Sequence, residues 1–309
     1  MSTAVASSAS LRVPSFTGYA WGVLGWNILV VLWGVLVRAS GSGAGCGSHW
    51  PLCNGEVIPS MRGMATVIEF SHRIMSGLAF VAVAGLLGWS LKLFPRAHRV
   101  RTMATAAFAF LIVEVALGAG LVLFQYVAGN VSTGRAFFLS LHLANTQILL
   151  ATLALTAWFS RPNGRASVRA SPLHVSALAA AIVVSITGAI AALGDTLFPV
   201  SSIAEGVRQD FSASAHFLLR LRIVHPAMAI AAAAFFIWIS VRALRSDSVT
   251  ARRIALAAVI FTIAQLSAGA LNWALLAPVG LQIVHLLFAD LLWITLVLLT
   301  VEASQVATS

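Results

Sequence analysis

The chain has 309 residues, of which 60% are hydrophobic and only 9% are charged. A soluble domain carries roughly 25% charged residues, so this composition excludes an ordinary soluble protein and indicates an integral membrane protein surrounded by lipid. The formal net charge is +10, but the basic residues gather at the ends of apolar segments, which argues against nucleic acid as a partner.

Eight apolar segments are long enough to cross a bilayer, since a transmembrane helix needs about 20 mostly apolar residues. We predict helices over residues 18–38, 67–91, 102–125, 137–158, 173–193, 219–241, 253–275 and 280–302. The apolar core of the first segment is too long for a cleaved signal peptide, so we predict that it is retained. The fold class is therefore all-α, with eight transmembrane helices.

Lysine and arginine concentrate between predicted helices two and three, four and five, and six and seven. By the positive-inside rule, these loops and both termini face the cytoplasm of a multi-pass protein in the cell membrane. Residues 1–17, rich in Ser and Ala, and residues 303–309 are predicted to be disordered tails, and 159–172 a cytoplasmic linker. The long loops 39–66 and 194–218 then lie on the outer side.

The first four predicted helices resemble the last four. The sequence SLHLA around His142 resembles IVHLL around His285, and ALGAGL in the third helix resembles LSAGAL in the seventh. Each half has four helices, so both halves enter the membrane in the same direction. We therefore predict two pseudo-symmetric four-helix bundles, over residues 18–158 and 173–302.

Four histidines occupy matching places in this repeat. They are His72, His142, His225 and His285. Each lies five or six residues from the outer end of its helix, or roughly 8 Å deep. A pair of histidines on facing helices is what axial ligation of a haem iron requires, so we predict one haem site in each bundle, toward the outer side. A lone membrane histidine is often a packing residue, but four at matched depth favour ligation over packing or zinc binding.

Haem propionates need cations near the water interface, and arginines stand beside two of these histidines. Arg73 directly follows His72, while Arg220 and Arg222 precede His225. Each arginine could equally extend its charged group from a helix end into water.

One acidic residue distinguishes the halves. Glu69 stands three residues before His72 on the same helical face, whereas the matching position in the second half is Arg222. A carboxylate beside an iron site could position water, relay protons or stabilise positive charge. We therefore predict chemistry in the first half and electron storage in the second. Glu114 and Asp290 lie deeper and stay outside the predicted catalytic set.

Both cysteines of the chain, Cys46 and Cys53, lie in the glycine-rich loop 39–66. A disulfide that closes this small ring would contribute about 2 to 3 kcal/mol of stability. A redox role, in which the thiols pass electrons, is equally open. Small residues in the segment AAAAFF would permit close helix contacts and a homo-oligomer.

Together these features resemble the haem A synthase family, membrane enzymes that oxidise haem O to haem A for terminal oxidases. The resemblance runs from VRASGSGAGCGSHWPLCNG through IEFSHR, SLHLANT and RIVHP to LQIVHLL. It implies that His225 and His285, with Arg222 nearby, bind a permanent b-type haem. His72 and His142, with Arg73, would hold the substrate haem O.

The resemblance also assigns a catalytic set, which comprises Glu69 as the functional acid and Cys46 with Cys53 as the outer cysteine pair. It implies that a methyl group becomes a formyl group by successive hydroxylations and loss of water. A haem O synthase and a quinol or thiol electron donor would be the partners. Some family members carry a second cysteine pair that this sequence lacks. A dihaem cytochrome oxidising quinol and a non-catalytic haem carrier are the alternatives.

Overall fold

The computed structural model describes residues 2–61, 63–161 and 171–306, which form helices without any extended strand. The elements in chain order are α1 Ser2–Ala39, η1 Ser42–Ala44, α2 Met64–Leu93, α3 Arg99–Leu123, α4 Thr133–Phe159, α5 Pro172–Leu197, α6 Ile203–Asp210, α7 Phe217–Arg222, α8 Val224–Ala243, α9 Val249–Ala274 and α10 Val279–Val306. Within the described ranges, eight spans are long and apolar enough to cross a membrane, with α7 and α8 forming one of them. The predicted all-helical, multi-pass fold is confirmed.

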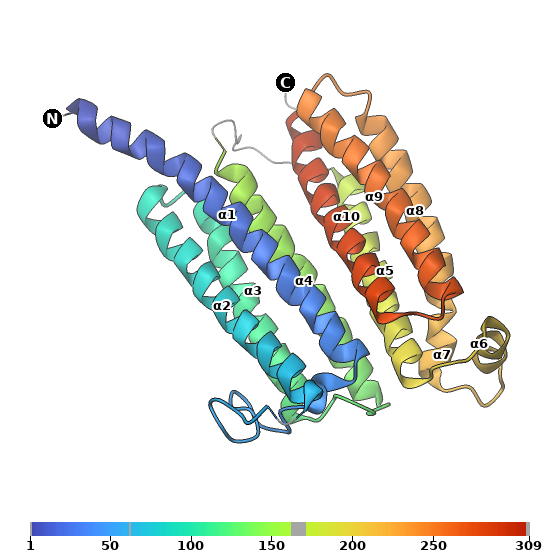
Figure 1. The fold of residues 1–309 in the computed structure, drawn as a ribbon. Coiled ribbons are helices and arrows are strands. Elements are labelled where there is room, and N and C mark those ends of the chain that lie inside the picture. The colour runs from blue at the N-terminus through green and yellow to red at the C-terminus, as the bar shows by residue number, and fades with distance from the viewer. Residues whose placement is uncertain (1, 62, 162–170, 307–309) are drawn as a thin grey trace.

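The helices pack as two groups of four (Figure 1). One group comprises α1, α2, α3 and α4, and the other comprises α5, α8, α9 and α10. The groups meet where α4 and α1 pack against α10 and α5. The start of α1 and the end of α10 lie at one end of the molecule, and residues 40–61 lie at the opposite end, which we call the disulfide end (Figure 1). That this end faces outward, and that a twofold axis relates the groups, stay predictions.

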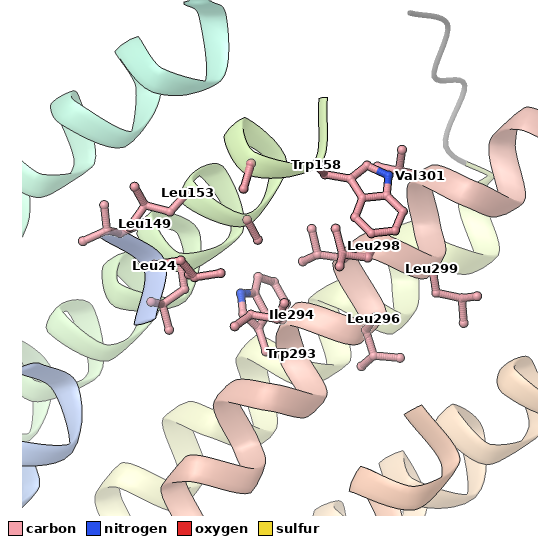
Figure 2. Close-up of a cluster of buried hydrophobic side chains, with 14 of the residues drawn as sticks. Leu24, Leu149, Leu153, Trp158, Trp293, Ile294, Leu296, Leu298, Leu299 and Val301 are labelled. Atoms are coloured by element: carbon pink, nitrogen blue, oxygen red, sulfur yellow. The ribbon is translucent and has the colours of Figure 1, made fainter. Parts of the chain in front are cut away.

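Large apolar side chains fill the space between the two groups (Figure 2). Leu24 of α1 and Leu149 of α4 lie near Trp293 and Ile294 of α10, and all four are buried. The Trp293 indole N–H also donates to the Gln147 carbonyl at 2.6 Å. Since lipid is as apolar as these side chains, close van der Waals packing stabilises the contact rather than exclusion of water. This contact holds α5 and α10 beside the first group, where they can contribute to its cavity.

Several helices begin a few residues before their predicted starts because polar side chains cap them. The Ser132 hydroxyl accepts the Arg135 N–H at 3.3 Å, and the Ser248 hydroxyl accepts the Ala251 N–H at 3.2 Å. Such caps satisfy backbone donors that a helix start leaves free. The apolar pattern alone does not extend to these polar first turns.

The predicted helix over 219–241 is interrupted at Ile223, between α7 and α8. Pro226 has no N–H to donate to the Arg222 carbonyl four residues earlier, which removes one helical hydrogen bond at that position. The predicted loop 194–218 also contains the short helix α6, whose first turn is capped when Ser202 accepts the Glu205 N–H at 3.2 Å.

The structure differs from the disordered tail predicted over 1–17, because α1 begins at Ser2. The alanines of this segment have the highest helix propensity of any residue, and this favours continuation of the membrane helix toward the N-terminus. At the other end, α10 extends to Val306, beyond the predicted start of a tail at 303. Residues 307–309, and 162–170 of the predicted linker, lie outside the described residues.

Candidate functional site

A cavity of about 580 Å³ opens among the helices of the first group and extends to α5 and α10. Its wall includes Glu69, His72, Arg73 and His142. The structure therefore brings together, from α2 and α4, four of the six residues predicted to bind or transform a substrate, while Cys46 and Cys53 are not part of this wall. Trp50, from the loop before α2, also lines the cavity and places that loop at its edge.

One ring nitrogen of each histidine in this cavity lacks a hydrogen-bond partner among the described residues. The Nδ1 atoms of His72 and His142 are buried and make no hydrogen bond with the described residues. The His142 Nδ1 lies 3.4 Å from Glu114 Oε1, which is a close electrostatic contact without hydrogen-bond geometry. Buried nitrogens without partners are costly unless a bound group satisfies them.

Glu114 of α3 belongs to this wall, although the sequence analysis left it outside the catalytic set. Its carboxylate accepts hydrogen bonds from Asn145 Nδ2, at 2.6 Å, and from the Thr146 hydroxyl. These two residues follow His142 on α4, so their bonds tie α3 to α4 beside the histidine. A carboxylate near a metal-binding imidazole fixes its ring orientation, which makes Glu114 a positioning candidate.

Glu69 connects the cavity to the outer loop. Its Oε2 accepts the backbone N–H of Cys46 at 2.8 Å, and its other oxygen forms an ion pair with Arg73. Arg73 Nη1 in turn donates to the carbonyls of His49 at 2.8 Å and Leu52 at 2.7 Å. The acid is only 3% exposed, so it is held in place by contacts on both oxygens.

Cys46 and Cys53 form a disulfide, and both are buried. The predicted pairing is thus present, while a redox role for it stays a prediction. The loop lies tightly on α2, because a side chain at Gly45 would collide with the backbone of Ala65 and Thr66. The Thr66 hydroxyl also donates to the Gly45 carbonyl at 2.8 Å.

In the second group of helices, His225 of α8 faces His285 of α10. Their ring centres lie 6.5 Å apart, and the ring planes make an angle of 83°. The Thr187 hydroxyl lies 3.1 Å from His225 Nδ1, and Gln265 Nε2 lies 3.3 Å from His285 Nε2. Each ring is therefore contacted from a neighbouring helix, and the separation leaves room for a metal-bearing plane between them.

A glycine on the preceding long helix faces each of the four histidines. The pairs are Gly34 with His72, Gly118 with His142, Gly188 with His225, and Gly269 with His285. A Cβ added at Gly188 or Gly269 would lie 2.9 Å from the Cε1 atom of its histidine, closer than packed atoms allow. At Gly34 and Gly118 the corresponding distances are 3.4 and 3.8 Å. A larger residue in place of any of these glycines would therefore reduce the space that the imidazole opposite it occupies.

Two of these glycines belong to the internal repeat. Gly118 and Gly269 lie in the segments ALGAGL and LSAGAL that revealed the repeat. The unpartnered Nδ1 atoms of His72, His142 and His285, the facing imidazoles of the second group and the glycine spaces of both groups fit haem as a ligand.

Arg222 lies where α5, α6 and α7 meet. Its guanidinium pairs with Asp195 at 2.9 Å and with Asp210 at 2.5 Å. Two carboxylates thus already neutralise the arginine that was predicted beside the second haem. Asp290 is fully buried in α10, and neither of its oxygens has a hydrogen-bond partner among the described residues. It is not part of the cavity wall.

The chain matches the COX15-CtaA family model, described as cytochrome oxidase assembly protein, over residues 17–297. It is 47% identical over 304 residues to proteins named protoheme IX farnesyltransferase from two strains of Thermus thermophilus. That match covers 96% of this chain and 50% of each relative, so the chain spans about half the length of those relatives. It is also 44% identical over 95 residues to heme A synthase from a strain of Bacillus cereus, covering 31% of this chain and 30% of the relative.

Proposed function

The chain belongs to the COX15-CtaA family of cytochrome oxidase assembly proteins, and on that premise we propose that it is a haem A synthase. The family predicted from the sequence is confirmed. In the proposed reaction, a methyl group of haem O is hydroxylated twice. In each step one atom of O2 is inserted into a C–H bond, while two electrons from the donor and two protons reduce the other atom to water. The resulting geminal diol loses water to give a formyl group.

The observation that carries this proposal is the position of Glu69 on the same cavity wall as His72 and His142. The cavity offers imidazoles for an iron, a buried acid, and a mainly apolar wall for a hydrophobic macrocycle. At the matching position in the second half stands Arg222, paired with two carboxylates. Only one of the two histidine pairs has an acid at this position. This difference supports a division between a site where haem O reacts and a site where a haem stores electrons.

The resident cofactor proposed for the second half is a b-type haem held by His225 and His285. When bound, it would supply reversible one-electron transfer. Thr187 and Gln265 would hold the two rings in the orientation that such a group needs. A quinol or a thiol would be the electron donor.

The Thermus thermophilus relatives support a proposal about the source of the substrate. Their name states farnesyl transfer to protohaem IX, and this chain matches about half of each. A farnesylated haem is the substrate that a haem A synthase consumes. We therefore propose that this chain receives its substrate from a haem O synthase and that the two activities are joined in those longer relatives.

The proposal is tested by extracting and chromatographing haems from cells with the protein, without it, and with Glu69→Gln. We expect haem A with the wild type, and haem O without haem A in the other two cases. Glu205→Gln, which changes a partly exposed acid of α6 that does not line the cavity, is the matched control and should yield haem A. Haem A in the absence of the protein would refute the proposed function.

The same experiment separates the alternatives. A dihaem cytochrome would leave the haem composition unchanged, and a haem carrier would alter haem delivery without making haem A. Purified protein incubated with protohaem IX and farnesyl diphosphate tests the other activity in the relatives' name. We expect no farnesylated product there.

A further inference from the structure

Arg135 is a buried cation without an acidic partner. It lies in the first turn of α4, is 3% exposed, and lines the cavity. Its Nη1 donates to the carbonyls of Ala128 and Asn130, the latter at 2.9 Å, and its Nε is buried with no partner. No ion pair among the described residues includes it. A buried charge of this kind is costly unless an anion pairs with it.

Arg38, near the end of α1, lines the same cavity. It donates to the Ala192 carbonyl at 2.8 Å and to the Gln282 side-chain oxygen at 2.7 Å, which belong to α5 and α10. It also donates to the Thr196 hydroxyl at 2.7 Å. All of these acceptors are neutral, and no carboxylate of the described residues lies within ion-pair distance. The cavity therefore has two guanidinium groups that form no ion pair with a described residue; the carboxylate of Asp195, which acts on Arg38 from a longer distance, is itself paired with Arg222.

The arginines predicted from the sequence to meet propionates differ in this respect. Arg73 is paired with Glu69 and bonds two loop carbonyls. Arg222 is paired with Asp195 and Asp210. Their positive charges are already compensated, so an incoming carboxylate would gain less there than at Arg38 or Arg135.

Helix geometry places Arg38 and Arg135 on the disulfide side of the histidines. Arg135 precedes His142 by seven residues, which is two turns on one face of α4 and roughly 10 Å along its axis. Arg38 follows Gly34 by four residues, or roughly 6 Å, and Gly34 faces His72. A planar ligand held between His72 and His142 would present one edge toward this pair.

We propose that Arg135 and Arg38 form an anion site that binds the two propionate carboxylates of the haem in this cavity. The inference rests on the proposed function, because that function makes haem O the ligand. A guanidinium group can form two parallel hydrogen bonds with a carboxylate, which fixes orientation as well as affinity. The site would thus set which edge of the macrocycle faces the disulfide end and which methyl group approaches Glu69.

The test compares haem O with its dimethyl ester, in which both propionates are uncharged. Each is titrated into purified protein and followed by difference absorbance, with wild type, Arg135→Gln and Arg38→Gln. We expect the wild type to prefer the free acid by on the order of tenfold or more. Arg135→Gln should weaken binding of the free acid by a similar factor and leave binding of the ester unchanged. Arg38→Gln should also weaken binding of the free acid.

Two further variants keep the result interpretable. Arg135→Lys retains the charge and should retain a preference for the free acid. Arg101→Gln removes an arginine that does not line the cavity and should bind both ligands as the wild type does. An intact disulfide and a monodisperse elution profile check that each variant is folded.

Equal losses for acid and ester in Arg135→Gln would show a structural role alone and overturn the inference. A phospholipid retained by the wild type and lost by Arg135→Gln, together with equal binding of acid and ester, would assign the site to a lipid phosphate and also overturn it. Absence of any haem O binding to the wild type would refute the proposed function itself. Tight binding of haem O that ignores both arginines would refute only the anion site.

Discussion

The backbone N–H of Cys46 donates to the carboxylate of Glu69 at 2.8 Å. The disulfide loop and the buried acid of the cavity are therefore one structural unit. The ion pair of Glu69 with Arg73, and the bonds from Arg73 to two loop carbonyls, close this unit from the other side. This arrangement gives the disulfide a structural role that requires no change in its redox state.

Removal of the disulfide should reduce turnover more than substrate binding. We expect the double variant Cys46→Ser with Cys53→Ser to lose about 2 to 3 kcal/mol of stability. Release of the Cys46 N–H removes a hydrogen bond to a charged group, worth about 1.5 to 3 kcal/mol, so turnover should fall on the order of tenfold or more. Haem O titration and haem A formation by the purified variant measure the two effects.

Thr66→Val separates a structural from a redox role of the cysteines. It removes the hydrogen bond to the Gly45 carbonyl next to Cys46, at 2.8 Å, but leaves the disulfide in place. A neutral hydrogen bond contributes about 0.5 to 1.5 kcal/mol, so turnover should fall by a few-fold. Full activity in Thr66→Val with none in the double serine variant would indicate that the cysteines exchange electrons.

Of the four glycines that face a histidine, those opposite His225 and His285 should be the least tolerant of a methyl group. A Cβ at Gly188 or Gly269 would lie 2.9 Å from the imidazole, and such overpacking costs about 1 to 3 kcal/mol. If the proposed b-type haem is bound there, the purified wild type should show low-spin haem absorbance, and we expect Gly188→Ala and Gly269→Ala to lose most of it.

Two other glycines serve as comparisons. Gly118→Ala places its Cβ 3.8 Å from His142, an ordinary contact, and should have a small effect. Gly88→Ala, on α2 with no atom within 4 Å of the added Cβ, is the control. Equal haem absorbance in Gly188→Ala and Gly88→Ala would contradict a role of the glycine in seating His225.

The fold was largely predictable because the bilayer restricts the solutions. A span must be about 20 apolar residues long and must satisfy its own backbone hydrogen bonds, so composition alone located all eight spans. The break at Ile223 and the helix α6 were missed. They depend on a single lost hydrogen bond before Pro226 and on capping by Ser202, which hydrophobicity does not report.

The site was predictable where residues share one helix, and less so where helices meet. Glu69 and His72 lie three residues apart on α2, so their common face follows from helical spacing. The approach of Glu114 to His142 depends on how α3 and α4 are rotated against each other. The burial of Arg135 depends on the loop before α4, since an arginine near a helix end usually reaches water.

Arg222 should contribute more to stability than an exposed arginine does. Its side chain is 12% exposed and pairs with Asp195 and Asp210, so Arg222→Leu leaves two carboxylates unpaired in a partly buried site. Loss of one partner of a buried ion pair costs about 3 to 5 kcal/mol, and this partly exposed site should lose less. Thermal melting in detergent measures the change. Arg220→Leu, at an exposed position, is the control and should melt as the wild type does.

The triple variant Arg222→Leu, Asp195→Asn, Asp210→Asn checks the mechanism, because it leaves no charge unpaired and should recover part of the stability. A loss of resident haem in Arg222→Leu that the triple variant does not recover would favour the predicted contact with a propionate. Unchanged melting in Arg222→Leu would show that the ion pairs contribute nothing measurable.

The most informative comparison between the two halves concerns the partners of His142 and His285. The carboxylate of Glu114 lies 3.4 Å from His142 Nδ1, whereas His285 is contacted by the neutral amide of Gln265 at 3.3 Å. A carboxylate that orients a ligating imidazole typically changes metal affinity by about 10- to 100-fold. We therefore expect Glu114→Gln to weaken haem O binding on the order of tenfold and to leave the resident haem spectrum unchanged.

Gln265→Glu makes the reciprocal change beside His285. The added negative charge would stabilise the oxidised iron of a haem bound there, so a redox titration should show a lower midpoint potential for the resident haem. Thr146→Val removes a hydrogen-bond donor to Glu114 but keeps the acid, and should lie between the wild type and Glu114→Gln in haem O affinity. Identical affinities in the wild type and Glu114→Gln would show that the carboxylate does not position His142. An unchanged midpoint potential in Gln265→Glu would show that a charge at position 265 does not act on a haem bound at His285.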